Sequence, residues 1–248
     1  LLLSLGLDAV FVLTTTPELL NLSAEEFYSE VLCRCFHSAA IAEGEDFHFG
    51  RNRQGTLSDL KRWADRDSIE LTAVSPVRIS GTAVSSSRIR GLLEKGNVTD
   101  ANELLVFPYR VEGQVEQGQR RGKELGFPTA NLGSVYTLVP QDGVYAGVAT
   151  IASGARYGAA IHVGKNLTFG AANKTIEVHL LGFSGDLYGQ VLQVEFFQRI
   201  RATEKFEGVD ALTKQLHADV AQIESLSQLN LEKPQAQRVS LSSASFSG

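Results

Sequence analysis

The periodicity of apolar residues changes once along this chain, at Phe107 and Pro108, and this change constrains the fold more than any other feature. Before it, short apolar runs alternate with segments whose apolar residues recur at helical spacing. Such alternation is typical of a parallel, doubly wound sheet. We therefore expect an α/β domain over residues 1–107, with strands at 9–13, 39–42 and 69–74 and helices at 23–36, 57–66, 85–95 and 99–105.

After Pro108 the apolar residues recur at every second position, and glycine-rich turns separate the runs. Strands in series with tight turns indicate a small antiparallel barrel. We expect its strands at 109–115, 144–151, 158–163, 174–181 and 191–200. Leu212, Leu216, Val220 and Ile223 then follow helical spacing, which predicts a helix over 208–226 that packs on the barrel. Residues 227–248 lose this periodicity and are rich in serine, so we expect a disordered tail.

Composition and charge exclude several functional classes. The chain has 248 residues, a net charge of −5 and a pI near 5.6, unlike a general nucleic-acid-binding protein. It contains no run of about 20 apolar residues, so we expect no membrane span. Cys33 and Cys35 are two apart on an expected helix and point to nearly opposite sides, which makes them a poor metal site with His37. Two cysteines indicate no disulfide framework, and a reducing cytoplasm is the simplest compartment.

The segment from Gly118 to Asn131 joins a basic, glycine-rich loop to two oxygen-bearing side chains. Glycines let backbone N–H groups approach an anion, and basic side chains add positive charge there. The residues expected to bind nucleotide phosphates are Gly118, Arg120, Arg121, Gly122, Lys123, Gly126 and Pro128. If a strand follows, Thr129 and Asn131 point to one face and offer a hydroxyl and an amide carbonyl, ligands that Mg²⁺ accepts. The segment therefore predicts a site for nucleotide phosphate and Mg²⁺.

This segment also has a plainer interpretation as a hairpin turn, because it lacks the P-loop pattern that leads into a helix. However, its last six residues, Gly-Phe-Pro-Thr-Ala-Asn, closely resemble the signature of riboflavin kinases, in particular of the bacterial bifunctional riboflavin kinase/FMN adenylyltransferase (FAD synthetase) family. Further segments resemble this family in the same order, at 140–146, 164–170, 175–181, 186–189 and 200–219. Leu167 stands where the family usually has proline.

The first hundred residues resemble the adenylyltransferase half of the same family, at 22–27, 44–50 and 84–90. The resemblance implies a nucleotide or flavin site formed by Asp46, Phe47, Ser85, Ser86, Ser87, Arg88 and Arg90. Free N–H groups, hydroxyls and guanidinium groups all favour a triphosphate, although a serine-capped surface helix is the plainer alternative. The histidine-containing turn that opens this half in the family is absent from the sequence. We therefore expect an N-terminally incomplete domain that lacks its first strand, and no useful conversion of FMN to FAD by this chain.

The expected strand at 174–181 carries the candidate catalytic residue. Its apolar side chains share one face, so Glu177 and His179 project from the other. A charge on the outer face of an ordinary strand is the plainer interpretation. The family resemblance implies instead that Glu177 accepts or orients the proton of riboflavin's ribityl 5′-hydroxyl as this attacks the γ-phosphate of ATP, and that Arg201 and Phe206 border the flavin. We expect His179 to be an ordinary strand histidine outside the catalytic set.

The resemblance thus implies a Rossmann-like nucleotidyltransferase domain over 1–107 and a Greek-key barrel with the riboflavin kinase fold over 108–226. The expected enzyme is a transferase, an Mg-ATP-dependent riboflavin kinase, with FMN adenylyltransferase activity in the full-length parent. Riboflavin, ATP and FMN are its expected partners; ATP is a co-substrate, and FMN and FAD are products rather than prosthetic groups. The rival hypothesis is a flavin- or nucleotide-binding module whose chemistry has decayed, with Leu167 as the visible departure. Tight binding without turnover would distinguish it.

Overall fold

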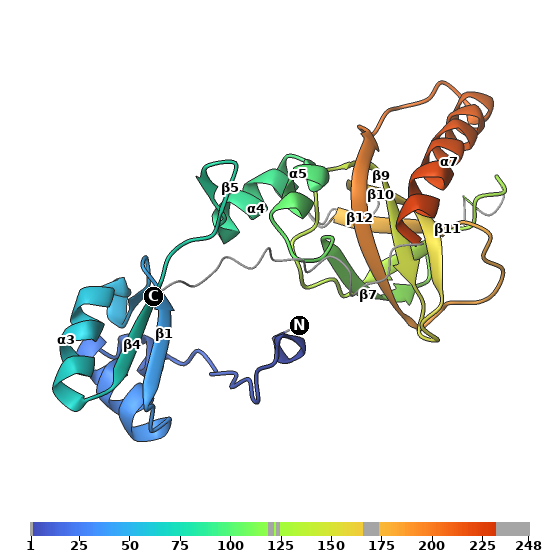
Figure 1. Ribbon diagram of the computed structural model, residues 1–248. Helices are drawn as coiled ribbons and strands as arrows, with labels where there is room; N and C mark the ends of the chain where they lie inside the picture. The colour runs from blue at the N-terminus through green and yellow to red at the C-terminus, as the bar shows by residue number, and fades with distance from the viewer. Residues whose placement is uncertain (1, 119–121, 123–124, 166–173, 232–248) are drawn as a thin grey trace. The chain divides into compact units, whose positions relative to one another are not determined.

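The computed structural model describes residues 2–118, 122, 125–165 and 174–231. These residues form two compact units, Leu1–Ala83 and Val84–Gly248, and each is described by itself (Figure 1). No helix within the described part of the chain is long and apolar enough to cross a lipid bilayer.

The N-terminal unit is built around a parallel pair of strands, β1 (Ala40–Gly44) and β4 (Glu70–Val74), connected through helix α3 (Leu57–Asp67). Helix α3 begins at a capping box in which Thr56 and Asp59 satisfy each other's backbone N–H groups. The remaining elements of the N-terminal unit are η1 (Leu3–Leu5), α1 (Pro17–Asn21), α2 (Ala24–Glu26), the π-helical η2 (Phe27–Cys35), β2 (His48–Phe49), η3 (Arg51–Arg53), β3 (Gly55–Thr56), β5 (Arg78–Ile79) and β6 (Thr82–Ala83). The parallel βαβ arrangement confirms the expected fold class of this region.

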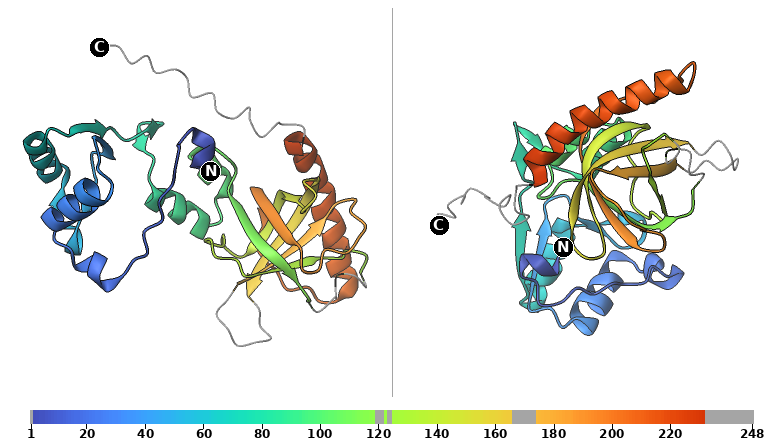
Figure 2. Two further views of the ribbon diagram at one scale, coloured as in Figure 1. Left: turned by 90° about the horizontal axis from the view of Figure 1, so that it is seen from below. Right: turned by 90° about the vertical axis from the view of Figure 1, so that its right-hand side faces the viewer.

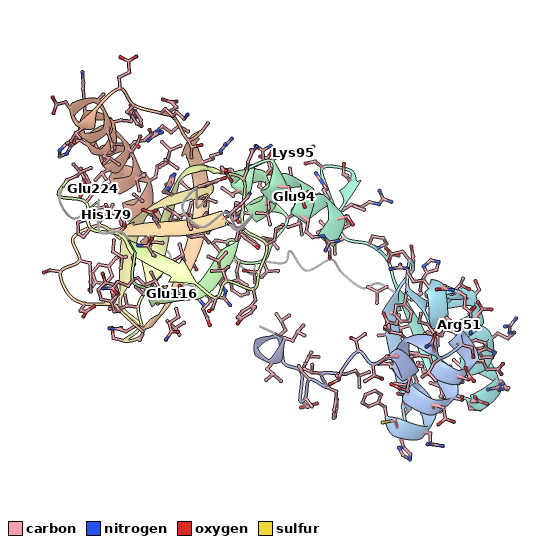
Figure 3. All side chains as sticks on the ribbon, turned by 180° about the vertical axis from the view of Figure 1, so that it is seen from behind. Arg51, Glu94, Lys95, Glu116, His179 and Glu224 are labelled. Carbon is pink, nitrogen blue, oxygen red and sulfur yellow. The ribbon has the colours of Figure 1, made fainter. Side chains whose placement is uncertain are left out.

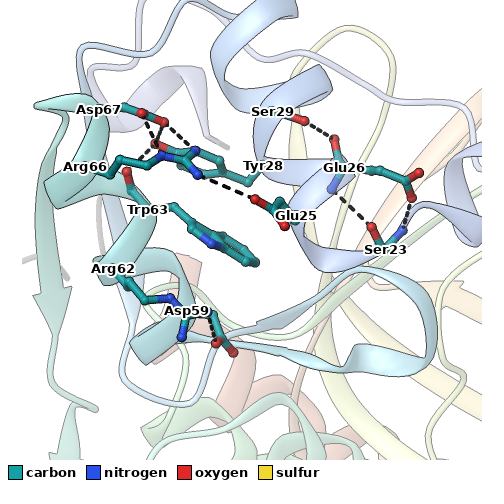
Figure 4. A network of polar contacts seen from close by, with 10 residues as sticks. All are labelled: Ser23, Glu25, Glu26, Tyr28, Ser29, Asp59, Arg62, Trp63, Arg66 and Asp67. Carbon is teal, nitrogen blue, oxygen red and sulfur yellow. Dashed lines mark hydrogen bonds and ion pairs between the residues drawn. The ribbon is translucent and has the colours of Figure 1, made fainter.

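The core of this unit is aromatic and contains one buried polar contact. Tyr28 is fully buried and packs against Trp63, with ring centroids 5.5 Å apart. Its hydroxyl donates to the Trp63 carbonyl and to the Asp67 carboxylate, each at 3.0 Å (Figure 4). Burial raises the pKa of this hydroxyl, so Tyr28 remains a neutral donor. These contacts hold η2 against α3.

The strand predicted at 9–13 is wrong. These residues form no strand, and Phe11 and Val12 are 71% and 89% exposed. An apolar run becomes a strand only where a neighbouring strand accepts its hydrogen bonds, and in the described residues β1 and β4 pair only with each other. The run therefore stays extended and exposed.

The C-terminal unit is a closed barrel with strand order β10-β11-β8-β7-β12-β9, in which all paired neighbours are antiparallel. Its strands are β7 (Arg110–Glu116), β8 (Ala130–Gly133), β9 (Gly143–Thr150), β10 (Arg156–Lys165), β11 (Lys174–Leu180) and β12 (Val191–Arg201). The alternation seen in the sequence fills the interior, as Ile176, Val178 and Leu180 of β11 illustrate. The predicted antiparallel barrel is therefore confirmed, and β8 is a strand that the sequence left conditional.

In the described part of this unit, three helices, α4, α5 and α7, pack against the barrel. Helices α4 (Ser86–Glu94) and α5 (Val98–Glu103) contribute Leu93, Val98 and Ala101 to the core cluster that fills the barrel. Asn102 fastens them further, because its amide donates to the Phe196 carbonyl at 2.8 Å and accepts from the Tyr109 N–H at 2.6 Å. Residues 84–107 thus pack with the barrel, and the domain boundary expected at 107 stays a prediction.

Helix α7 (Val209–Leu231) runs along the outside of the barrel beside β9 and β10 (Figure 2). Ile223 anchors it in a buried cluster with Val144 and Ala146. The helix continues past the predicted end at residue 226, because Gln228 and the leucines of this stretch are good helix formers. The first residues of the expected disordered tail are therefore helical, and 232–248 lie outside the described residues.

Candidate active site

A cavity of about 440 Å³ lies on the outer face of the barrel, between the strands and helix α7. Its walls come from the turn before β8, from β9, β10 and β11, from the segment after β12 and from α7. The lining residues are Gly122, Leu125, Phe127, Thr129, Val144, Ala160, Ile161, His162, Glu177, His179, Arg201, Thr203, Glu204, Phe206, Leu212, Leu216, Asp219 and Val220. A largely apolar hollow with a few polar groups is the usual form of a small-molecule site.

Three polar side chains form a row across adjacent strands of this face. Glu177 of β11 is the cross-strand partner of Asn131 on β8 and of His162 on β10. Directly opposed residues in antiparallel strands have Cβ atoms about 5 Å apart. The neighbours of Glu177 along β11, Ile176 and Val178, are buried in the barrel, so its carboxylate belongs to the outer face. The strand register thus places a carboxylate beside an amide and an imidazole.

The segment around Thr129 is in close contact with the backbone of two glycines, Gly118 and Gly122. The Gly122 carbonyl accepts hydrogen bonds from the N–H groups of Leu125 and Phe127, at 3.2 Å and 2.8 Å. A Cβ at Gly122 would overlap the Phe127 carbonyl oxygen, and one at Gly118 would overlap the side-chain amide of Asn131. Only glycine permits this packing, so Gly122 lies directly against the Phe127 carbonyl and Gly118 against the Asn131 side chain.

Thr129 and Asn131 fit a hard cation such as Mg²⁺. They offer a hydroxyl and an amide carbonyl, both half-buried, at the start of β8 next to the strand that carries Glu177. Neutral oxygen ligands leave room in the coordination shell for phosphate oxygens and water.

One wall of the cavity is fastened by a buried ion pair. Arg201, at the end of β12, donates through Nε and one terminal nitrogen to both oxygens of Asp219 on α7, at 2.8–3.1 Å. Gln215 donates to the same carboxylate at 2.8 Å, and the Arg201 guanidinium lies 5.5 Å from the centre of the Phe206 ring. Asp219 is 3% exposed. The pair ties β12, α7 and the segment between them around the cavity.

A second cavity, of about 570 Å³, lies on the other side of Thr129. It is lined by Val115, Pro128, Thr129, Ala130, Leu180, Phe183, Ser184, Gly185, Asp186, Leu187 and Tyr188. Thr129 belongs to the walls of both cavities. Two ligands bound here would therefore meet at this residue.

Comparison with known proteins gives the family. A riboflavin kinase family model matches residues 105–227, and an FAD synthetase model matches residues 1–88. The bifunctional riboflavin kinase/FMN adenylyltransferase of Listeria monocytogenes is 33% identical over 87% of this chain and 68% of its own length. The Pseudomonas fluorescens protein of the same name is 34% identical over 89% of this chain and 71% of its own. The chain belongs to the bifunctional riboflavin kinase/FMN adenylyltransferase family.

A solved structure of the same overall fold carries a different name. It is described as a macrolide-efflux protein from Streptococcus pneumoniae, and it matches with a TM-score of 0.74 and 35% identity over 84% of this chain and 67% of its own. Membership of the riboflavin kinase/FMN adenylyltransferase family confirms the predicted family, fold class and transferase class.

The structure brings together most of the residues predicted for the kinase half of this family. Gly122, Thr129, Glu177, Arg201 and Phe206 line the first cavity, and Pro128 lines the second. Asn131 and Gly118 lie beside them, and Gly126 forms a turn with φ of +84°. Arg120, Arg121, Lys123 and Leu167 lie outside the described residues.

The residues predicted for the adenylyltransferase half are divided between the two units. Asp46 and Phe47 belong to the N-terminal unit, whereas Ser85, Ser86, Ser87, Arg88 and Arg90 lie at the start of α4 in the other. Ser85 caps α4 by accepting from the Arg88 N–H at 3.2 Å, which is the plainer role that the sequence also allows. Their part in a nucleotide site stays a prediction.

Sequence reasoning missed His162 and set His179 aside, although both line the first cavity with Glu177. The alternation of β10 puts His162 on the outer face, yet only the register reveals that it opposes Glu177. The signal for His179 was its position two residues after Glu177 on the same strand face.

Proposed function

We propose that this chain transfers the γ-phosphoryl group of ATP to the ribityl 5′-hydroxyl of riboflavin, with Mg²⁺, and releases FMN and ADP. The observation that carries the proposal is that Thr129 lines both cavities and that the outward-facing Glu177 lines the first of them. Direct phosphoryl transfer requires two substrates whose reacting ends meet, and this arrangement provides such a meeting point. The names of the relatives supply the substrates.

Riboflavin fits the first cavity by its chemistry. Phe127, Phe206, Leu212, Leu216 and Val220 give the cavity an apolar lining for a planar ring system. Glu177 supplies a carboxylate on the strand wall for a hydroxyl of the ribityl chain. A volume of about 440 Å³ lies in the usual range for small-molecule sites.

ATP fits the second cavity, with its phosphates directed toward Thr129. Gly118 lies against the Asn131 side chain and Gly122 against the Phe127 carbonyl. We propose that Arg120, Arg121 and Lys123, which lie outside the described residues, neutralise phosphate charge. Thr129 and Asn131 would hold Mg²⁺. When bound, the ion would offset negative charge on the β- and γ-phosphate oxygens.

The proposed role of Glu177 is that of a general base. As the 5′-oxygen forms its bond to the γ-phosphorus, the bond from that phosphorus to the bridging oxygen of ADP breaks. The hydroxyl proton passes to the Glu177 carboxylate, which therefore must be ionised at the start. Arg201 and Phe206 would keep the flavin side of the cavity closed to water, because the ion pair with Asp219 holds that wall in place.

FMN adenylyltransferase activity, which the relatives' name also states, is proposed for the full-length protein. Asp46, Phe47 and the serines and arginines at the start of α4 are its proposed residues. We also propose a cytoplasmic location, which the two free cysteines, Cys33 and Cys35, support.

The test is to incubate the protein with riboflavin, ATP and Mg²⁺ and to separate riboflavin, FMN and FAD. We expect FMN and ADP in equal amounts, and none when the metal is chelated. If both substrates bind to folded protein and no FMN forms, the proposed kinase is wrong and the non-catalytic binding module is favoured.

A further inference from the structure

His179 makes a hydrogen bond that fixes its tautomer. Its Nδ1 lies 2.8 Å from the carbonyl oxygen of Pro128, across 51 residues of sequence. His179 is labelled in Figure 3. A carbonyl oxygen only accepts, so Nδ1 carries the hydrogen and donates it. The imidazole is thereby tied to the turn that precedes Thr129.

The hydrogen bond between His179 and Pro128 lies just beyond the point where the pairing of β8 with β11 ends. The pairing of β8 with β11 ends at Ala130, opposite Val178. Proline has no N–H, so Pro128 cannot extend the ladder as a backbone donor. The His179 side chain instead bonds the Pro128 carbonyl. Thr129 therefore lies between Pro128, which is bonded to His179, and Ala130, which pairs with Val178 of β11.

The same turn also makes aromatic contacts, one with His179 and one with helix α7. The Phe127 ring, which is 8% exposed, meets the edge of His179 at a centroid distance of 5.6 Å and that of His217 on α7 at 4.9 Å. Edge-to-face arrangements are favourable for aromatic rings at these distances. Phe127 therefore packs between β11 and α7, and Pro128 is hydrogen-bonded to β11 through His179.

We propose that His179 is a positioning residue of the kinase reaction, which acts by fixing the hydroxyl of Thr129 through the Pro128 carbonyl. The inference rests on the proposed function, because the role of Thr129 in holding Mg²⁺ comes from there. Residues that orient a metal ligand typically change metal affinity or activity by about 10–100-fold when they are replaced.

Two variants separate the hydrogen bond from the rest of the side chain. His179→Phe keeps a ring against Phe127 but removes the donor, whereas His179→Asn places an amide nitrogen near the position of Nδ1. We expect His179→Phe to raise the Mg²⁺ concentration for half-maximal FMN formation about tenfold or more, and His179→Asn to recover most of that loss. Equal impairment in both variants, with activity retained in His179→Gln, would show that Nε2 acts on the substrate and would overturn the proposal.

A double-variant cycle tests whether His179 acts through Thr129. In a Thr129→Ala background, His179→Phe should change the Mg²⁺ requirement by less than about twofold, because the hydroxyl to be positioned is gone. Independent, multiplying effects would contradict the proposal. His48→Phe is the matched control: His48 Nδ1 lies 2.9 Å from the Asp46 carbonyl in the N-terminal unit, and its replacement should leave FMN formation unchanged.

A readout without substrates keeps this test separate from the kinase assignment. Nitrogen-15 NMR of the histidine rings in the full chain, at mildly alkaline pH, should show His179 protonated at Nδ1, with its signal identified by its loss in His179→Phe. The same replacement should shift the backbone amide signal of Thr129. A hydrogen on Nε2, or an unchanged Thr129 signal, would overturn the inference, whether or not the wild-type protein forms FMN.

Discussion

The N-terminal unit pairs two parallel strands, whereas the C-terminal unit closes six antiparallel strands into a barrel. In the described part of the N-terminal unit, β1 and β4 leave their outer edges unpaired, and Phe11 and Val12 remain exposed. The barrel has no open edge, and its interior holds an almost continuous set of fully buried apolar side chains. This difference indicates that the candidate kinase site rests on the more stable of the two units.

The largest expected effect comes from comparing two fragments of the C-terminal unit, one with and one without residues 84–107. A fragment that begins at Val84 should fold and form FMN, whereas one that begins at Pro108 loses Leu93, Val98 and Ala101, each no more than 1% exposed. Full burial of one leucine or valine contributes about 1.5–3 kcal/mol, and a domain's total stability is only about 5–15 kcal/mol. Thermal unfolding followed by circular dichroism measures the loss. Equal stability of the two fragments would show that α4 and α5 are dispensable to the barrel.

Substitution of Glu177 sharpens the comparison at the active site. Glu177→Gln should lower kcat for FMN formation by about 10²-fold or more, because it removes the proposed base from the transition state, with the Tm unchanged. The matched control is Glu224→Gln, which neutralises an exposed carboxylate on α7 and should keep wild-type kcat (Figure 3). Wild-type turnover in Glu177→Gln would assign the proton to another acceptor.

Tyr28→Phe addresses the N-terminal unit alone and has a smaller expected effect. It removes the hydrogen bonds to the Trp63 carbonyl and to Asp67 and should lower the free energy of unfolding of this unit by about 1 kcal/mol. Trp63 is the single tryptophan of the chain, so its fluorescence reports on this unit. FMN formation should not change, and a parallel loss of kinase activity would contradict independent units.

The smallest expected effect is an acid sensitivity of the N-terminal unit. Hydrogen bonds from the Ser23 N–H, from the Thr56 hydroxyl and from Arg66 lower the pKa of Glu26, Asp59 and Asp67 respectively. A lowered pKa in the folded state adds stability above the unfolded value, and this stability is lost as pH falls through the folded value. Trp63 fluorescence should therefore change as pH falls below about 4. Thr56→Val, which removes the hydroxyl donor to Asp59, should make the change shallower.

The sequence was sufficient for the barrel strands and for the outward direction of Glu177, because both follow from local alternation in β11. It could not provide the row of Asn131, Glu177 and His162, since strand register depends on pairings between residues far apart in the chain. The wrong strand at 9–13 has the same origin: an apolar run has the same local pattern whether or not a partner strand lies beside it.

His179 illustrates the same limit within the candidate site. Its position beside Glu177 was visible in the sequence, but its hydrogen bond joins it to Pro128, whose carbonyl no local pattern identifies as the acceptor. The Arg201–Asp219 pair likewise depends on where α7 packs. Contacts between elements, rather than the elements themselves, are what the sequence could not predict.

The shared position of Thr129 implies a thermodynamic coupling between the two substrates. Thr129 belongs to the walls of both cavities, so a ligand that restrains its side chain from one cavity changes the contacts that this side chain makes with a ligand in the other. Linkage requires that the effect be reciprocal: if a non-hydrolysable ATP analogue with Mg²⁺ changes the riboflavin Kd by some factor, riboflavin must change the Kd of that analogue by the same factor. We expect this factor to approach one in Thr129→Ala, because the residue that lines both cavities then has no hydroxyl through which the two ligands can affect each other.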